Sequence, residues 1–367
     1  MQMTIRAVIV DDSIVVRHTV SNVLGATDDV EIVATASSGR MGLSRIAEFH
    51  PDVVTLDVEM PGMNGLETLA EIRREWPDLP VIMYSTLTER GATATFDALA
   101  IGAADYATKP TGAVSREAAE DQVRDNLLPL VRLWGGRVGR MRLAGRAAKK
   151  VVEQNPNGPI SYRTAGTATP NIVVVGVSTG GPDALVEIVP QIPVDLPVPL
   201  VIVQHMPPVF TNMLAQRLDK VCPLPVTEAV DGEHLDAGHL YIAPGGRHLE
   251  VLNTKTGFQA RLTDAEPENS CRPAVDVLFR SAAKAAGPRT LGVVLTGMGQ
   301  DGLLGSHDIV NAGGSVIIQD EATSVVWGMP GFVARAGIAT AALPLKDIAP
   351  AIGLRVHSAT RSQGAAV

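Results

Sequence analysis

Residues 171–181 read NIVVVGVSTGG, and this stretch decides the fold of the second half of the chain. Its apolar start predicts a buried strand, and the glycines followed by Pro182 predict a sharp turn into a helix. Ser178 would present its hydroxyl at this turn, where the first turn of the helix offers unpaired N–H groups to an oxyanion. Such turns also bind phosphate or only pack, so the motif alone does not establish catalysis.

Two other predicted strands end in residues that complete a catalytic set. Residues 200–204 (LVIVQ) run into His205, and residues 291–295 (LGVVL) run into a glycine-rich turn that contains Asp301. The carboxyl ends of parallel strands share one edge of a sheet, so Ser178, His205 and Asp301 are expected to converge. They would supply a nucleophile, a general base and an acid that orients the imidazole.

Each member of this set has competitors. A histidine at a strand end is often only a hydrogen-bonded structural residue, and an aspartate in a glycine-rich turn often only caps a helix. The rival histidines are His234, His239 and His248, and the rival acids are Asp183 and Asp276. The proposed three are favoured because each follows a separate apolar run at the same predicted edge.

The first 130 residues predict a separate α/β unit. Five apolar runs alternate with amphipathic stretches, at residues 7–10, 30–34, 53–56, 81–84 and 103–107. Asp11, Asp12 and Asp57 follow or end such runs, and three carboxylates at one edge suit Mg²⁺. Lys109 offers a point charge for a phosphoryl group, and Asp57 could attack a phosphate donor. Solvated helix caps are the alternative interpretation.

This first unit resembles a response-regulator receiver domain. The matching motifs are VDDS at 10–13, LDVEMPGMNG at 56–65 and DYATKP at 105–110. The resemblance implies that Asp57 accepts the phosphoryl group and that Asp11, Asp12 and Asp57 hold Mg²⁺. It also implies a chemotaxis histidine kinase as the phosphodonor.

The same resemblance assigns a switch. Ser85 would be the hydroxyl that follows the phosphoryl group, Tyr106 the aromatic ring that changes rotamer, and Lys109 the cation drawn to it. Spacing leaves Ser85 and Thr86 open as the switch hydroxyl.

The second unit resembles the protein-glutamate methylesterases of bacterial chemotaxis. The matching motifs are GVSTGG at 176–181, QHM at 204–206, RPAVDVLF at 272–279 and TGMGQDG at 296–302. The resemblance implies Ser178 as nucleophile, His205 as base and Asp301 as orienting acid. It implies the backbone N–H groups of Thr179 and Met298 as the oxyanion hole.

The resemblance also implies the reaction. The substrate would be the γ-methyl ester of glutamate on methyl-accepting chemotaxis receptors, cleaved to glutamate and methanol without a cofactor, with deamidation of receptor glutamines as a second activity. Arg272 would be a substrate-cleft residue, or else a partner in a surface salt bridge.

Composition bounds the remaining function classes. The 367 residues are 46% hydrophobic and 19% charged, with a net charge of −8, which disfavours nucleic acid or an anionic membrane as the main partner. No apolar run is long enough for membrane insertion, and the first ten residues lack signal-peptide anatomy. The two cysteines, Cys222 and Cys271, suit a reducing cytoplasm, and Cys271 is interpreted as only a small residue beside Arg272.

The predicted architecture is therefore two α/β domains. A five-stranded parallel receiver of flavodoxin-like fold, strand order 2-1-3-4-5, spans residues 1–131, and a doubly wound, Rossmann-like hydrolase domain spans 170–357. A basic linker containing glycine and proline would occupy 132–169, and a disordered tail 358–367. Two alternatives remain: a hydrolase of a pathway other than chemotaxis, and a signalling adaptor without turnover.

Overall fold

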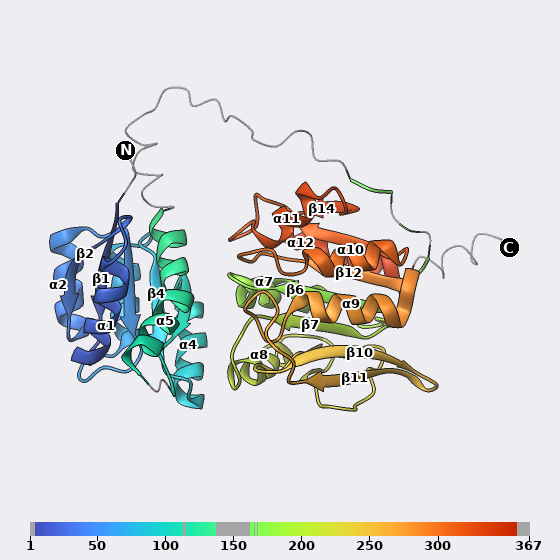
Figure 1. The fold of residues 1–367 in the computed structure, drawn as a ribbon, viewed down its shortest axis with the longest axis horizontal. Coiled ribbons are helices and arrows are strands. Elements are labelled where there is room, and N and C mark those ends of the chain that lie inside the picture. Colours follow the sequence, from blue (N-terminus) through green and yellow to red (C-terminus); the bar gives the residue numbers. More distant parts are fainter. Residues whose placement is uncertain (1–3, 113–114, 137–161, 165, 167, 358–367) are drawn as a thin grey trace, which may run out of the picture. The chain divides into compact units, whose positions relative to one another are not determined.

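The computed structural model describes residues 4–112, 115–136, 162–164, 166 and 168–357. The chain divides into two compact units, residues 1–154 and 155–367 (Figure 1). A helical stretch over 128–136 enters the start of the predicted linker. Most of that linker and the predicted tail lie outside the described residues, so the domain boundaries stay predictions.

The first unit is a five-stranded parallel sheet with strand order β2-β1-β3-β4-β5, which confirms the predicted flavodoxin-like order. Its strands are β1 (Ile5–Val10), β2 (Val30–Ala36), β3 (Val53–Asp57), β4 (Val81–Ser85) and β5 (Asp105–Thr108). Its helices are α1 (Ile14–Gly25), α2 (Gly39–Phe49), α3 (Gly65–Glu75), α4 (Glu89–Ile101) and α5 (Arg116–Asn126). Helix α1 packs against α5, while α3 packs between α2 and α4, so that helices cover both faces of the sheet.

Local sequence explains where these elements begin and end. All five residues of β3 are buried, as expected for a central parallel strand with helices on both faces. Helix α3 begins at a capping box, in which the Asn64 side chain accepts from the Glu67 N–H and the Glu67 carboxylate accepts from the Asn64 N–H. Such caps fix the loops that follow the strands; Asp11 and Asp12 lie in the loop after β1, and Asp57 ends β3.

The second unit is built on a seven-stranded parallel sheet with strand order β14-β13-β12-β6-β7-β9-β8. Its strands are β6 (Ile172–Val177), β7 (Leu200–Gln204), β8 (Val226–Glu228), β9 (Leu240–Ile242), β12 (Thr290–Val294), β13 (Ser315–Gln319) and β14 (Ala341–Leu343). An antiparallel hairpin joins β10 (His248–Thr254) to β11 (Gly257–Thr263). The doubly wound prediction is confirmed.

Helices surround this second sheet. They are α7 (Gly181–Ile188), α8 (Phe210–Asp219), α9 (Val275–Ala286), α10 (Leu303–Asn311), α11 (Met329–Arg335) and α12 (Leu345–Val356), with 3₁₀ turns at η1 (Val189–Gln191) and η2 (Gly287–Arg289). No helix of the described residues is long and apolar enough to cross a bilayer.

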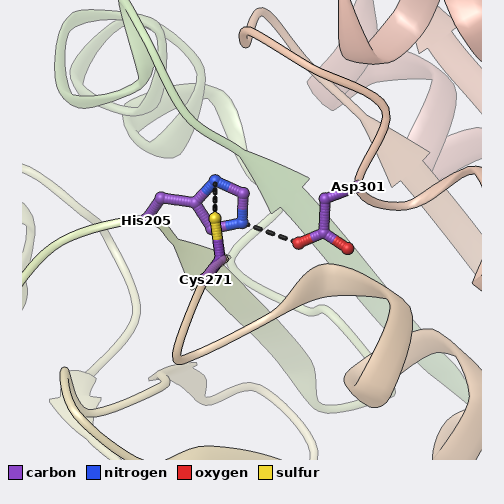
Figure 2. A group of neighbouring side chains, drawn as sticks. All are labelled: His205, Cys271 and Asp301. Carbon is purple, nitrogen blue, oxygen red and sulfur yellow. Dashed lines mark hydrogen bonds and ion pairs between the residues drawn. The ribbon is translucent and has the colours of Figure 1, made fainter. Parts of the chain in front are cut away.

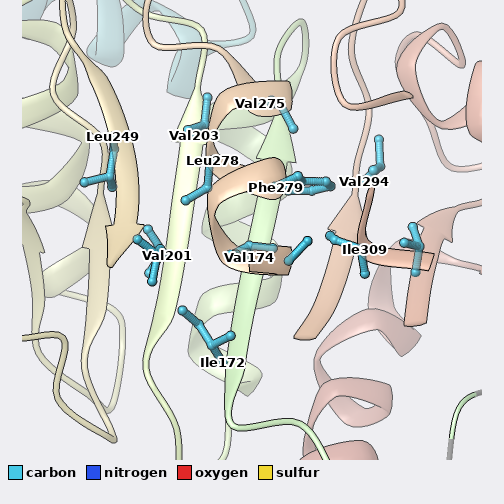
Figure 3. Packing of buried hydrophobic residues seen from close by; sticks show 14 of the residues in the cluster. Ile172, Val174, Val201, Val203, Leu249, Val275, Leu278, Phe279, Val294 and Ile309 are labelled. Atoms are coloured by element: carbon cyan, nitrogen blue, oxygen red, sulfur yellow. The ribbon is translucent and has the colours of Figure 1, made fainter. Parts of the chain in front are cut away.

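The hydrophobic core of this unit lies between the central strands and α9 (Figure 3). All six residues of β6 are buried. Helix α9 sits so close to β6 that a Cβ on Gly176 would meet Val275 Cγ1 at 2.3 Å. Gly176 is therefore needed for packing, and this contact brings the first turn of α9 to the carboxyl end of β6.

The strand order places the predicted catalytic residues together. Strand β6 is central, with β12 on one side and β7 on the other. After β6 the chain continues to β7 on one side of it, and later forms β12 on the other side. Strand β6 therefore lies at a topological switch point, and ligands of open α/β sheets bind at such points. Ser178, His205 and Asp301 follow these three neighbouring strands.

Candidate active site

Ser178 occupies the turn between β6 and α7. Its N–H donates to the Thr296 carbonyl (3.0 Å), and its own carbonyl accepts from the Gly181 N–H (2.8 Å). Gly180 has φ +73°, a left-handed conformation that glycine adopts without strain. The turn therefore holds the half-buried serine at the edge of the sheet beside the end of β12.

His205 and Asp301 form a direct pair. His205 Nε2 lies 2.7 Å from Asp301 Oδ2, and the two side chains are 13% and 2% exposed (Figure 2). The pair joins the ends of β7 and β12, as the sequence predicted. An acid bonded to one ring nitrogen fixes the orientation of the imidazole and leaves the other nitrogen for chemistry.

Backbone N–H groups hold the Asp301 carboxylate in place. The N–H groups of Val275 and Asp276, in the first turn of α9, donate at 2.7 and 2.9 Å, and that of Gly302 donates at 3.0 Å. The Asn269 side-chain amide adds a fourth donor at 3.1 Å. The N-terminus of a helix favours negative charge, so this arrangement stabilises the ionised form of a deeply buried acid.

The neighbouring acid, Asp276, differs from Asp301 in ionisation. Burial opposes the charge of Asp301, but the imidazole of His205 and the N–H groups of Asp276 and Val275 hold its pKa below the usual value. Burial, together with the nearby charge of Asp301, raises the pKa of Asp276 to about 6, although the Gly305 N–H bonds to it. Asp301 is thus the acid that stays ionised.

Cys271 contacts the other nitrogen of His205. Its Sγ lies 3.5 Å from His205 Nδ1, on the loop that precedes α9 (Figure 2). The interpretation of Cys271 as only a small residue is wrong, because α9 and its preceding loop fold back over the site. In the described part of the chain, no hydrogen bond joins Ser178 Oγ to His205, and Cys271 occupies the nitrogen that the serine would need.

These contacts shift the ionisation of His205. Burial alone would lower its pKa, but Asp301 and Cys271 each favour the charged ring and together raise the pKa to about 10. Both neighbours of the ring therefore favour its charged form.

The rival histidines have structural partners instead. His248 is buried and bonds the Glu266 carbonyl (3.0 Å) and the Ala274 N–H (3.2 Å), which fixes the loop before α9. His239 bonds the hydroxyl of Thr227 and stacks on Tyr241.

Among the described residues, neither remaining rival, His234 or Asp183, forms a hydrogen bond with His205 or Asp301. The backbone of His234 forms a β-bridge with Gln259, and Asp183 lies in the first turn of α7.

Three other predicted residues also lie in the second unit. The backbone N–H groups of Thr179 and Met298 donate no hydrogen bond to any other described residue. Arg272 donates to the carbonyls of Asp264 (3.2 Å) and Ala265 (3.0 Å), and no carboxylate of the described residues pairs with it. The salt-bridge alternative therefore has no support among those residues, while a role for Arg272 in substrate binding stays a prediction.

In the first unit, the predicted acids and lysine lie together. One carboxylate oxygen from each of Asp11, Asp12 and Asp57 falls within 4.8 Å of the others. Lys109 Nζ lies 2.8 Å from Asp11 Oδ2 and 2.8 Å from Asp57 Oδ2. Three hard oxygen donors fit Mg²⁺, which needs few protein ligands and retains water.

Burial sets the ionisation of this cluster. It raises the pKa of Asp57 to about 6, with Lys109 opposing the shift and Asp11 adding to it. Burial would lower the pKa of Lys109, but its bonds to Asp11 and Asp57 raise it. The cluster therefore favours an added cation, since the carboxylates are incompletely neutralised.

The predicted switch residues follow the neighbouring strands. Ser85, the last residue of β4, is buried, and its carbonyl accepts from the Lys109 N–H at 2.7 Å. The hydroxyl of Thr86 instead approaches that of Thr88, the N-cap of α4, at 3.4 Å. Tyr106 lies on β5, where burial and then Asp105 hold the pKa of its hydroxyl above the usual value.

The two folds and their edge residues define the class of this protein: a response regulator whose second unit is an α/β hydrolase. The receiver-domain family model matches residues 7–117, and the CheB methylesterase model matches residues 173–352. The chain belongs to the protein-glutamate methylesterase/protein-glutamine glutaminase family, and it is a hydrolase.

Relatives match nearly the whole chain. It is 48% identical to a protein of that name from Nocardioides sp., covering 95% of this chain and 94% of the relative. It is 46% identical to one from Trichodesmium erythraeum, covering 96% and 99%. A crystal structure of the Thermotoga maritima CheB methylesterase catalytic domain is 43% identical, with a TM-score of 0.49, covering 50% of this chain and 98% of that one.

Proposed function

We propose that this protein removes methyl groups from glutamate side chains of methyl-accepting chemotaxis receptors in the cytoplasm, under control of phosphorylation at Asp57. The observation that carries the hydrolytic step is the buried His205–Asp301 pair at the same sheet edge as Ser178. The names of the relatives support glutamyl methyl esters as the substrate and glutamine side chains as a second one.

The reaction uses Ser178 as the nucleophile. His205 Nδ1 accepts the hydroxyl proton while Ser178 Oγ attacks the ester carbonyl, and Asp301 stabilises the imidazolium through Nε2. The imidazolium then protonates the departing methanol. A water molecule, activated by the same nitrogen, hydrolyses the acyl-serine, which releases the glutamate side chain of the receptor as a carboxylate and regenerates Ser178.

The backbone N–H groups of Thr179 and Met298 stabilise the tetrahedral oxyanion. Their lack of other partners among the described residues supports this role, since donors already in place cost no reorganisation during the reaction. Loss of one such donor typically lowers the rate by about a hundredfold or more.

Phosphorylation of the receiver supplies the control. Asp57 attacks a phosphodonor, a chemotaxis histidine kinase, while Asp11, Asp12 and Asp57 would hold Mg²⁺, which offsets negative charge on the reacting phosphoryl group. The new charge attracts Lys109 and the hydroxyl of Ser85, which is favoured over Thr86 because Ser85 is buried at the end of β4 and its carbonyl bonds the Lys109 N–H. Tyr106 then changes rotamer and alters the surface of the receiver.

The deciding experiment measures methanol released from methyl-labelled receptors in membranes. The wild-type chain should release methanol, and Ser178→Ala should release almost none while retaining its fold by circular dichroism. Turnover by Ser178→Ala at the wild-type rate would exclude this serine as the nucleophile. A folded wild-type chain that releases no methanol would favour a different substrate or an adaptor role.

A further inference from the structure

Three side chains of metal-binding type meet at the hydrolase site. One ligand atom from each of His205, Cys271 and Asp301 lies within 4.8 Å of the others (Figure 2). They come from the loops after β7, before α9 and after β12. Imidazole nitrogen, thiolate sulfur and carboxylate oxygen are the ligands that Zn²⁺ takes in proteins.

The distance between nitrogen and sulfur suits a metal ion. His205 Nδ1 and Cys271 Sγ are 3.5 Å apart. A tetrahedral Zn²⁺ with a bond of about 2.0–2.1 Å to nitrogen and about 2.3 Å to sulfur holds these two ligands about 3.6 Å from each other. The pair therefore already has the separation that an ion would impose.

The other side of the ring has the support that a ligand histidine usually has. His205 Nε2 is bonded to Asp301 Oδ2 at 2.7 Å, and Asp301 is itself fixed by the N–H groups of Val275 and Asp276. A carboxylate on the far nitrogen fixes the tautomer and strengthens the near nitrogen as a metal ligand. The same contact that orients a general base thus also orients a metal ligand.

We propose that His205 Nδ1 and Cys271 Sγ bind Zn²⁺, with Asp301 in the outer shell and water in the remaining positions, and that the bound ion stops hydrolysis. Both ligand atoms bind the ion without a proton, so binding releases to solvent any proton that they carry. Inhibition follows because the ion occupies the nitrogen that must accept the proton of Ser178. The inhibition rests on the proposed function, whereas the binding does not.

A plain hydrogen bond between sulfur and nitrogen has the same length, so the test must detect the metal–sulfur bond itself. Co²⁺ serves as the probe, because it replaces Zn²⁺ in such sites and its bond to a thiolate gives a near-ultraviolet charge-transfer band. Co²⁺ held by the receiver carboxylates gives no such band, and excess Mg²⁺ competes for that second site.

The full-length chain is titrated with Co²⁺ in the presence of Mg²⁺. The thiolate band should appear at one equivalent and disappear when Zn²⁺ is added. It should be lost in Cys271→Ser and kept in Cys222→Ser, which changes the only other cysteine of the sequence. Absence of the band in the wild type, its persistence in Cys271→Ser, or its loss only in Cys222→Ser would each overturn the proposal.

Methanol release is then measured against Zn²⁺, with each variant compared with its own metal-free rate. The concentration for half inhibition should rise at least tenfold in Cys271→Ser and stay unchanged in Cys222→Ser. If the thiolate band forms but Zn²⁺ does not slow the wild type, the inhibitory role is overturned. A wild type that shows the band with Co²⁺, yet releases no methanol when it is free of metal, would overturn the proposed function and leave the binding site intact.

Discussion

The side-chain amide of Asn269 bridges Asp301 and its neighbour Asp276. Asn269 Nδ2 donates to Asp301 Oδ1 at 3.1 Å and to Asp276 Oδ2 at 2.9 Å. Asn269 reaches this position with a left-handed backbone, φ +53°. A single donor therefore lies between two buried carboxylates, only one of which has a lowered pKa. Asn269 is therefore placed to fix the orientation of Asp301.

Replacing Asn269 with glycine should slow catalysis while preserving the backbone. Without the amide, the two carboxylates repel each other, and Asp301 holds His205 less firmly. We expect kcat to fall about tenfold with little change in KM, and the free energy of unfolding to fall by about 1–3 kcal/mol. Ser270→Gly is the matched control, since Ser270 also has a left-handed φ, +61°. Equal turnover by the two variants would show that Asn269 has no such role.

The pH dependence of kcat/KM should report His205. The protonated ring cannot accept a proton from Ser178, so activity rises with pH as the Nδ1 proton leaves. Because the pKa of His205 is raised to about 10, the acid limb should lie above the usual histidine value of 6.5. Cys271→Ser removes one of the groups that raise this pKa, so the limb should move to lower pH. The acid limb should stay at the same pH in Cys222→Ser. If it also stays in Cys271→Ser, the assignment of this limb to His205 would be contradicted.

Asp301→Asn should reduce turnover severely. An amide at this position turns its NH₂ group toward donors on both sides and no longer stabilises the imidazolium, so kcat should fall by about 10²–10⁴-fold. Asp183→Asn, which changes the rival acid in α7, should retain turnover near the wild-type level. Methanol release under saturating substrate compares the two. A larger loss in Asp183→Asn than in Asp301→Asn would reverse the assignment.

Asp57 should make the receiver less stable as pH rises. Its raised pKa, about 6 against 3.8, means that the folded state still holds this proton at pH values where the unfolded state has lost it. Its contribution to stability therefore falls as pH rises through this window, by about 2–3 kcal/mol in all. Relative to Asp57→Asn, the wild type should lose stability between pH 4 and 7.

Calorimetry of the receiver transition measures this difference. Mg²⁺ at pH 7 should raise the unfolding temperature of the wild type more than that of Asp57→Asn. If the stability of the wild type and that of Asp57→Asn change in the same way with pH, the raised pKa of Asp57 would be ruled out.

Stimulation by a phosphodonor should depend on Asp57. With Mg²⁺ and a small phosphodonor such as acetyl phosphate, the wild-type chain should release methanol several-fold faster than without the donor. Asp57→Ala should show no stimulation over its own basal rate. Asp28→Ala, which changes an exposed acid in the turn before β2, is the control and should respond like the wild type. Stimulation that survives in Asp57→Ala would place the regulatory site elsewhere.

Much of the fold could be predicted because its strands are short, apolar and buried on both faces. Runs such as residues 172–175 and 53–56 have few other ways to bury their side chains, and the polar residue at each strand end marks the shared edge. The convergence of His205 with Asp301 follows from that topology alone.

The contacts made by the loop before α9 could not be predicted. Asn269 and Cys271 lie in no strand and have no periodicity, and their neighbourhood depends on how α9 packs on Gly176. The sequence around Cys271 gives one usable signal, a polar loop ahead of the helical motif at 272–279. The sequence does not predict that this loop lies beside the end of β7, where Cys271 contacts His205. That position depends on how α9 packs on the sheet.

The donors that hold Asp301 are mostly main-chain groups, and this has a consequence for sequence divergence. The N–H groups of Val275 and Asp276 remain whatever side chain stands at those positions, proline excepted, whereas Gly302 has φ +91° and its position favours glycine. Mutational drift along the exposed face of α9 can therefore leave the charge of the acid untouched. Selection should therefore preserve the small residues, such as Gly176, that let α9 approach the sheet. It should act less strongly on the side chains of the α9 residues whose N–H groups bond Asp301.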